Sequence, residues 1–410
     1  MTESGHGSKR RFERTDRQSN TQSILDLLRA NGPLTQADIS RATSLSRATV
    51  NNIVQALRDQ GTVEYEWKNR REALVGLSSA RGAIISIMVH DMAVQACLFD
   101  FAQQTRLDLS SGDLVGISAP ESSPAVVLAL ARRLIDGGAG RGVSVAGVAI
   151  AIEGPIEKST GAIARWAWQR LPHWKGLNLR EYFMRHLRLP VLVENDANLA
   201  AFAEWTWGVG RRCNHFVHIT CGEGIGGGII LNGEIYQGGS GLAGEIGHMV
   251  IEEQGTLCFC GSRGCLSGFA TERAILAALR DSEKSRNSLS EVVDSARHGD
   301  AACQRVLFEA GVHLGKALAT VVRVMGPDII AVGGTLATAG DIMFDGLRSC
   351  AEIINLRAIA KSPEFLAAGL IEDAPVLGGI AAMLSKLDLG SNVVEPWMRM
   401  PSPGIDQSAI

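Results

Sequence analysis

Residues 241–267 read GLAGEIGHMVIEEQGTLCFCGSRGCLS, and this stretch holds one histidine and three cysteines within a short span. The four side chains follow the pattern H-x9-C-x-C-x4-C and are His248, Cys258, Cys260 and Cys265. Three thiolates and one imidazole match the closed, four-coordinate site of a structural zinc ion. Glycines beside the cysteines would let the loop wrap an ion. Four unrelated buried or reactive side chains are the alternative, but their density favours zinc.

The composition limits what kind of chain surrounds this loop. The chain has 410 residues, of which 46% are hydrophobic and 20% charged, as in globular proteins of two or three domains. No apolar run approaches the roughly 20 residues of a membrane helix, and the polar start shows no signal peptide. We therefore expect no membrane association and a cytoplasmic location, where thiols stay reduced. The remaining cysteines are expected to be core thiols: Cys97, Cys213, Cys221, Cys303 and Cys350.

Charge is distributed unevenly along the chain. The formal net charge is −3, yet basic residues outnumber acidic ones within residues 1–82, so the remainder is clearly acidic. A basic head on an acidic body suggests that the head meets a polyanion. Chance variation in surface charge would explain the same count.

The basic head contains the pattern of a DNA-binding unit. Three short helices are expected between residues 20 and 59, the second capped by Thr35 and the third by Ser46. In the third helix, apolar residues at positions 50, 53, 54 and 57 form one stripe, and the other faces are polar. A short helix, a tight turn and a polar-faced helix are typical of a helix-turn-helix, whose last helix enters the major groove.

The residues after the third helix predict a two-stranded wing with a basic tip, which would follow the phosphate backbone or minor groove. Asn, Gln and Arg side chains suit contacts with base edges. The predicted DNA-contacting residues are Ser46, Arg47, Thr49, Asn51, Asn52, Lys68, Arg70 and Arg71. A three-helix interaction module with a solvated polar face is the alternative.

From about residue 83 the chain changes to apolar strand-like runs that alternate with helical stretches. This alternation predicts α/β layers with largely buried sheets. The segment VENDAN places Glu194, Asn195 and Asp196 at the end of a short strand, where ligand sites of α/β sheets gather. A glycine-rich segment follows, but it lacks the Lys-Ser/Thr of a phosphate-binding loop and is a weak signal by itself.

Taken together, GLAGEIGH, CFCGSRGCL and the upstream VENDAN resemble the ROK family, named for repressors, open reading frames and kinases. The resemblance covers roughly residues 83–388. With a winged helix-turn-helix in front, the chain is similar to the sugar-responsive repressors of that family. The resemblance implies an actin-like sugar kinase fold of two α/β lobes around a cleft, assembled as a homodimer or homotetramer.

The resemblance also implies roles for particular residues. The zinc ion would be structural and would position the sugar-binding loop. The residues implied to contact a sugar or sugar-derivative effector are Gly154, Asn195, Asp196, Glu245 and His248, the last being also a zinc ligand.

Two positions depart from the family pattern. Family kinases carry a phosphate-binding D-x-G-G-T where this chain has Met88-Val89-His90-Asp91-Met92, and a loop without glycine cannot cradle ATP phosphates. Asp196 stands at the catalytic base position, but a base without bound ATP transfers no phosphate. Ser267 replaces a glutamate that contacts the anomeric end of the sugar, so we expect an effector other than free glucose.

The leading hypothesis is a transcriptional repressor that has no enzymatic activity and binds a double-stranded DNA operator under the control of a sugar. The alternatives are a sugar kinase with a fused regulatory domain, and a regulator controlled by a protein partner. The expected organisation is a flexible basic arm (1–19), a winged helix-turn-helix domain (20–80), a kinase-like effector domain (83–388) and a disordered tail (391–410).

Overall fold

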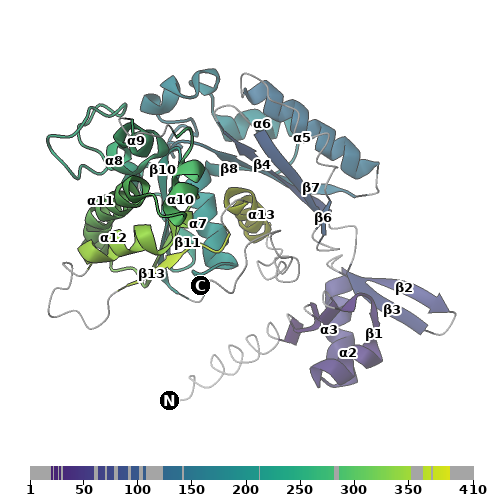
Figure 1. Cartoon of the computed structure of the whole chain (residues 1–410). Coiled ribbons are helices and arrows are strands. Elements are labelled where there is room, and N and C mark those ends of the chain that lie inside the picture. The colour runs from purple at the N-terminus through teal and green to yellow at the C-terminus, as the bar shows by residue number, and fades with distance from the viewer. Residues whose placement is uncertain are drawn as a thin grey trace, which may run out of the picture.

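The computed structural model describes residues 20–387, except 22, 26, 29–30, 60–62, 70–71, 78–81, 91–93, 101–104, 108–122, 141–142, 212, 281–285, 352–362 and 371–372 (Figure 1). The predicted arm (1–19) and tail (391–410) lie outside the described residues. Within the described ranges, no helix is both long and apolar enough to cross a membrane.

Of the three helices predicted for the head, the second and third are α2 (Gln36–Thr43) and α3 (Arg47–Asp59), and the described residues between 20 and 31 are helical. The Thr35 hydroxyl accepts a hydrogen bond from the Asp38 backbone N–H at 3.1 Å and so caps α2, as predicted. The Ser46 hydroxyl accepts in the same way from the Thr49 N–H at 3.1 Å. The predicted apolar stripe of α3 is buried against the rest of the head, and comprises Val50, Ile53, Val54 and Leu57.

The wing is a hairpin of β2 (Val63–Asn69) and β3 (Glu72–Leu77). A third strand, β1 (Leu34–Thr35), pairs with the other edge of β3 and was not predicted. Lys68, expected at the tip, lies within β2, whereas Arg70 and Arg71 fall outside the described residues.

The body has two five-stranded sheets with the same arrangement of strands. The first runs in the order β6-β5-β4-β7-β8 and the second in the order β11-β10-β9-β12-β13. In each sheet the first three strands in this order are antiparallel neighbours and the last three are parallel neighbours. The strands of the first sheet are β4 (Ala83–Val89), β5 (Val94–Asp100), β6 (Thr105–Leu107), β7 (Val145–Ile152) and β8 (Val191–Asn195). Those of the second are β9 (His215–Cys221), β10 (Ile225–Leu231), β11 (Glu234–Ile235), β12 (Ile329–Gly333) and β13 (Glu364–Ala367).

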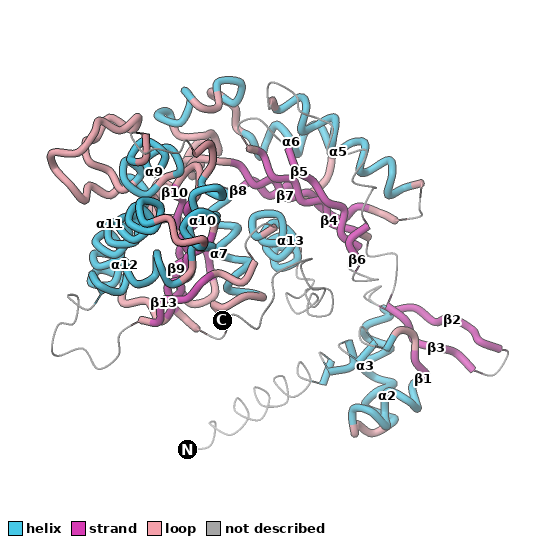
Figure 2. The backbone as a smooth tube through the Cα atoms, viewed as in Figure 1, coloured by secondary structure: helices cyan, strands magenta, loops and turns pink. Residues whose placement is uncertain are grey.

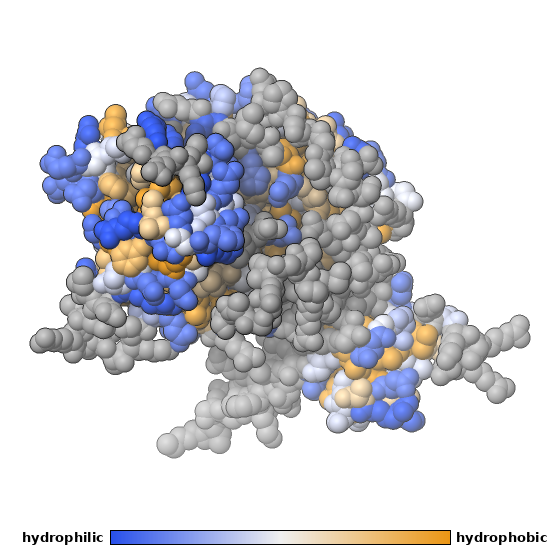
Figure 3. All heavy atoms as spheres, viewed as in Figure 1, coloured by the Kyte–Doolittle hydropathy of each residue, from blue (hydrophilic) through white to orange (hydrophobic). Residues whose placement is uncertain are grey.

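Helices cover the outer face of each sheet (Figures 1 and 2). On the first sheet these are α5 (Pro124–Ala139) and α6 (Leu179–Leu187). On the second they are α8 (Ser267–Ala270), α9 (Glu272–Ala278), α10 (Leu289–Arg297), α11 (Ala301–Met325) and α12 (Asp341–Ala351). Short 3₁₀ turns lie at η2 (Arg165–Gln169), η3 (Pro172–Trp174), η4 (Ile246–His248) and η5 (Thr335–Ala339). On the coloured part of the surface in Figure 3, hydrophilic side chains alternate with hydrophobic ones. The outcome is the two-lobed α/β body that the sequence predicts.

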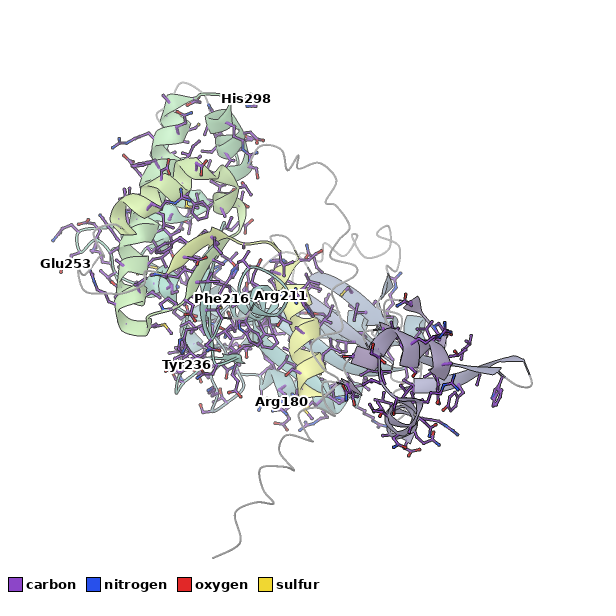
Figure 4. All side chains as sticks on the ribbon, turned by 90° about the horizontal axis from the view of Figure 1, so that it is seen from below. Arg180, Arg211, Phe216, Tyr236, Glu253 and His298 are labelled. Carbon is purple, nitrogen blue, oxygen red and sulfur yellow. The ribbon has the colours of Figure 1, made fainter. Side chains whose placement is uncertain are left out.

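Two helices, α7 (Asp196–Thr206) and α13 (Ala374–Lys386), pack between the sheets. Phe216 of β9 belongs to this central core and is labelled near α13 in Figure 4. A buried hydrogen bond of 2.7 Å from the Ser86 hydroxyl to the Val376 carbonyl ties β4 to α13. The core therefore joins the lobes through α7 and α13, and α7 begins at the site described next.

Close packing explains the glycine-rich strand β10. A Cβ atom on Gly228 would lie 2.4 Å from the carbonyl oxygen of Ala197 in α7. Only glycine lets the helix approach the strand this closely. The glycines of this strand thus bring α7 close to the second sheet, and we assign them no phosphate-binding role.

Candidate functional site

A cavity of about 550 Å³ lies between the two sheets, within the range of small-molecule sites. It brings together residues separated by more than ninety positions in the chain. All five predicted effector residues line it: Gly154, Asn195, Asp196, Glu245 and His248. They come from the turn after β7, the junction of β8 with α7, and the start and end of η4.

Asn195 caps α7, and this capping uses its side chain. Its amide oxygen accepts from the Asn198 N–H at 3.0 Å. Its amide nitrogen donates to the Gly154 carbonyl at 3.2 Å and to Asp196 Oδ1 at 3.1 Å. The sequence assigns Asn195 to the effector, whereas these contacts show that it also fixes Gly154 and Asp196 in place.

Asp196 begins α7 and faces other acidic groups across the cavity. Burial, followed by repulsion from Glu153, raises the pKa of Asp196 from its ordinary 3.8 to about 7. Burial, followed by repulsion from Asp196, likewise raises the pKa of Glu245 to about 7. Carboxyl groups in this arrangement can accept hydrogen bonds from ligand hydroxyls, and near neutral pH they can also hold a proton.

His248 connects the cavity to the cysteine loop. Its Nδ1 lies 3.5 Å from Cys258 Sγ, and its Nε2 lies 4.0 Å from a carboxylate oxygen of Glu245. Phe259 packs edge-on against the imidazole ring, with centroids 5.0 Å apart, and also lines the cavity. The His248 ring is therefore shared by the cavity and the cysteine cluster.

The predicted metal ligands are close together. The donor atoms of His248, Cys258, Cys260 and Cys265 all lie within 4.8 Å of one another. Cys260 Sγ and Cys265 Sγ are 3.7 Å apart, and no described cysteine forms a disulfide. Tetrahedral zinc with Zn–S near 2.3 Å and Zn–N near 2.0–2.1 Å would separate two sulfurs by about 3.8 Å and a sulfur and a nitrogen by about 3.6 Å. The observed 3.7 and 3.5 Å fit a tetrahedral ion.

The loop backbone is shaped around these ligands. Gly264 has φ of 72°, and a Cβ there would lie 1.6 Å from the Glu252 carbonyl oxygen. No other residue could occupy this position without moving the backbone. Bridges from Val250 to Cys265 and from Leu257 to Arg263 close the loop, from which Glu253 projects outward in Figure 4.

Other cavity residues were not predicted as site residues. Glu153 lies between a histidine and an arginine: its Oε1 is 3.6 Å from His90 Nδ1, and its Oε2 is 3.4 Å from Arg170 Nη2. The hydrogen bond with Glu153 raises the pKa of His90. Glu223, in the turn between β9 and β10, adds a further carboxylate to the lining. The only sequence signal for this group is the IEGPIE segment that contains Glu153.

Of Ser267 and His218, only His218 lines the cavity. The Ser267 hydroxyl donates to the Gly247 carbonyl at 2.7 Å, and Ser267 is not among the residues that line the cavity. His218 of β9 does line it; burial lowers the pKa of His218 to about 4, which leaves its ring neutral. Its Nε2 lies 3.0 Å from the Thr220 hydroxyl oxygen.

The predicted DNA-contacting residues of α3 lie on its outer side. Ser46, Arg47, Asn51 and Asn52 are exposed. Thr49 is half-buried, and its hydroxyl pairs with that of Ser46 at 2.8 Å, so both belong to the cap. Arg58 lies over the ring of Tyr65 at 5.2 Å, which fixes the end of α3 on the wing.

Comparison with known families assigns both parts of the chain. The ROK family model matches residues 93–386, which is most of the chain. This protein belongs to the ROK family. A second model, described as winged helix-turn-helix DNA-binding, matches residues 17–64, a range that contains α2 and α3 and ends at the start of β2. The ROK actin-like fold behind a winged helix-turn-helix, expected from the sequence, is thus confirmed.

Both regulators and kinases of the ROK family resemble this chain. The xylose repressor of Bacillus spizizenii is 26% identical over 364 residues, covering 88% of this chain and 93% of the repressor. The glucokinase of Thermotoga maritima is 31% identical over 254 residues, covering 58% of this chain and 80% of the kinase. A solved ROK family transcriptional regulator, a homologue of the Escherichia coli MLC protein, has a TM-score of 0.65 and 24% identity, covering 89% and 95% of the two chains.

Proposed function

We propose that this ROK protein is a sugar-responsive transcriptional repressor that binds DNA through α3 and the wing. One observation carries this proposal: a winged helix-turn-helix and a ROK body occur in one chain, and similarity to a xylose repressor extends over 88% of its length. Exposed Arg47, Asn51 and Asn52 supply base-reading side chains on α3. A homodimer or homotetramer would present two such heads to a palindromic operator.

In this proposal the cavity is a sensor. A sugar would engage Asp196, Glu245 and His248, which belong to both lobes of the body. The lobes would close to different degrees in a DNA-binding state and in a released state. A sugar that binds one of these states more tightly would change the free energy of DNA binding by at most its difference in binding free energy between them.

We also propose that the His248–cysteine cluster holds a structural zinc ion. The donor set and the two distances given above support zinc. When bound, the ion would hold the loop closed and fix the orientation of the His248 ring, while the residues of the cavity make the effector contacts.

The proposal is tested by fluorescence anisotropy on a DNA fragment from upstream of the protein's own gene, at fixed salt. Tight binding that resists competitor DNA, and that one member of a sugar panel releases or strengthens, is the expected result. Binding that no sugar alters would point to control by a protein partner. Binding no tighter than to a scrambled fragment would contradict repression at that site.

A sugar kinase with a regulatory head is the second candidate, favoured by the retained Asp196 and the similarity to a glucokinase. The acidic lining of the cavity argues against it, because the phosphates of a nucleotide would add negative charge beside Glu153 and Glu223. An ATP-coupled assay decides the matter. Turnover with a hexose that Asp196→Asn abolishes would establish the kinase.

A further inference from the structure

The cavity has an excess of acidic side chains. Its described lining contains Glu153, Asp196, Glu223 and Glu245. Arg170 is the one lysine or arginine among these lining residues, and it faces the Glu153 carboxylate. His90, which can also carry a charge, faces the other oxygen of that same carboxylate. Both cationic groups are therefore already paired with Glu153.

The two remaining histidines of the described lining offer a phosphate no free positive charge. His218 is neutral, and Nδ1 of His248 faces the cysteine cluster. The N-terminus of α7 would otherwise attract an anion. Its first N–H groups already bond to the chain itself, because Asn195 accepts from the Asn198 N–H and the Asp196 carboxylate accepts from the Ala197 N–H.

A phosphate monoester carries close to two negative charges and requires cations or oriented N–H groups. In this cavity it would meet the carboxyl groups of Asp196, Glu223 and Glu245, and it would have to displace Glu153 from Arg170. A neutral sugar has no such conflict, since its hydroxyl groups donate hydrogen bonds to carboxylates.

We infer that the effector is an unphosphorylated sugar, and that Glu153 enforces this choice by holding Arg170 and His90. The inference rests on the proposed sugar-sensing function and deepens it. Glu153 acts as a specificity-determining residue: it repels a phosphate directly, and it withholds the two cationic groups that could bind one.

The test is isothermal titration calorimetry on the full-length protein with matched pairs of ligands: glucose, N-acetylglucosamine and xylose, each with and without its phosphate ester. We expect a free sugar to bind the wild type at least tenfold more tightly than its ester. Glu153→Gln keeps the size of the side chain but removes its negative charge, so that Arg170 and His90 lose their ionic partner. This variant should reduce the ratio of the ester's Kd to the free sugar's Kd by about tenfold or more, mainly because the ester binds more tightly.

Glu157→Gln is the matched control, because Glu157 follows on the same segment and does not line the cavity; it should leave the ratio unchanged. If Glu153→Gln lowers the melting temperature sharply, Glu223→Gln replaces it. That variant removes a carboxylate exposed at the cavity without freeing Arg170, so a smaller narrowing is expected.

A phosphate ester that binds the wild type more tightly than its free sugar would overturn this inference and leave the sensor standing. An unchanged ratio in both variants would also overturn it. Failure of every sugar and ester to bind would overturn the inference together with sugar sensing, while DNA binding in the anisotropy assay would still report on the repressor separately.

Discussion

The carboxyl group of Asp196 is partly buried beside other acids at the cavity, and this arrangement links its protonation to folding. Its pKa is raised from 3.8 to about 7, so the folded protein holds the proton more tightly than the unfolded chain does. The stabilising effect of the neutral acid is fully present below about pH 3.8 and is lost as the pH rises through about 7. At higher pH the buried negative charge destabilises the lobe junction.

Asp196→Asn should therefore stabilise the protein at alkaline pH. Asparagine keeps an oxygen that can accept from Asn195 and removes the charge. We expect a gain approaching about 4 kcal/mol at pH 8, and a gain about 2–3 kcal/mol smaller at pH 5. Thermal unfolding at both pH values measures the difference. Asp341→Asn, whose side chain is 93% exposed, is the control, and equal effects of the two variants would contradict the assignment.

At the scale of the element, one face of α3 packs in the core of the head and the opposite face is exposed. Val50, Ile53, Val54 and Leu57 are buried and hold the helix in the head, while Arg47, Asn51 and Asn52 remain exposed. Substitutions on the exposed face should consequently alter recognition without altering the fold.

Asn51→Ala tests this separation. We expect it to weaken binding to the operator by about 1–3 kcal/mol and to change binding to scrambled DNA little, because a base contact is lost and phosphate contacts remain. Anisotropy with both DNAs at one salt concentration gives the comparison. An equal loss on both DNAs would show that Asn51 contacts the backbone, and an unchanged affinity for the operator would remove Asn51 from the base-reading set.

The local features of these elements could be predicted from the sequence because neighbouring residues determine them. The caps by Thr35 and Ser46 and the cysteine spacing are of this kind. Strand β1 was missed because two residues give no periodicity. The group of His90, Glu153 and Arg170 was missed because its members approach only after the first lobe folds.

On the scale of the whole molecule, the cysteine loop reaches the cavity through Phe259 and the core of the second lobe through Leu266. Val250 and Cys265 bridge within it, and Leu266 belongs to the core of that lobe. Because metal binding to a preformed site adds to folding free energy, loss of an ion here should destabilise the second lobe.

Chelation of the metal, or Cys260→Ser, should lower the melting temperature by about 5–10 °C and reduce sugar affinity. Cys213→Ser is the matched control: Cys213 is half-buried outside the cluster, and its thiol donates to the Gly210 carbonyl, as a serine hydroxyl can. Metal analysis of the purified protein should find one zinc per chain. Absence of metal together with an unchanged melting temperature in Cys260→Ser would refute the zinc proposal.

One imidazole ring has its two nitrogens in different environments, Nδ1 beside Cys258 and Nε2 toward Glu245. A ligand bound at one nitrogen changes the electron density at the other, because the two share the aromatic ring. Thermodynamic linkage makes the effect reciprocal. A metal that raises the affinity for a carbohydrate is itself bound more tightly, by the same factor, when the carbohydrate is bound. With zinc bound at His248 as proposed, a cell depleted of zinc would respond to a given sugar concentration as though the sugar were scarcer, and abundant sugar would raise the affinity for the metal.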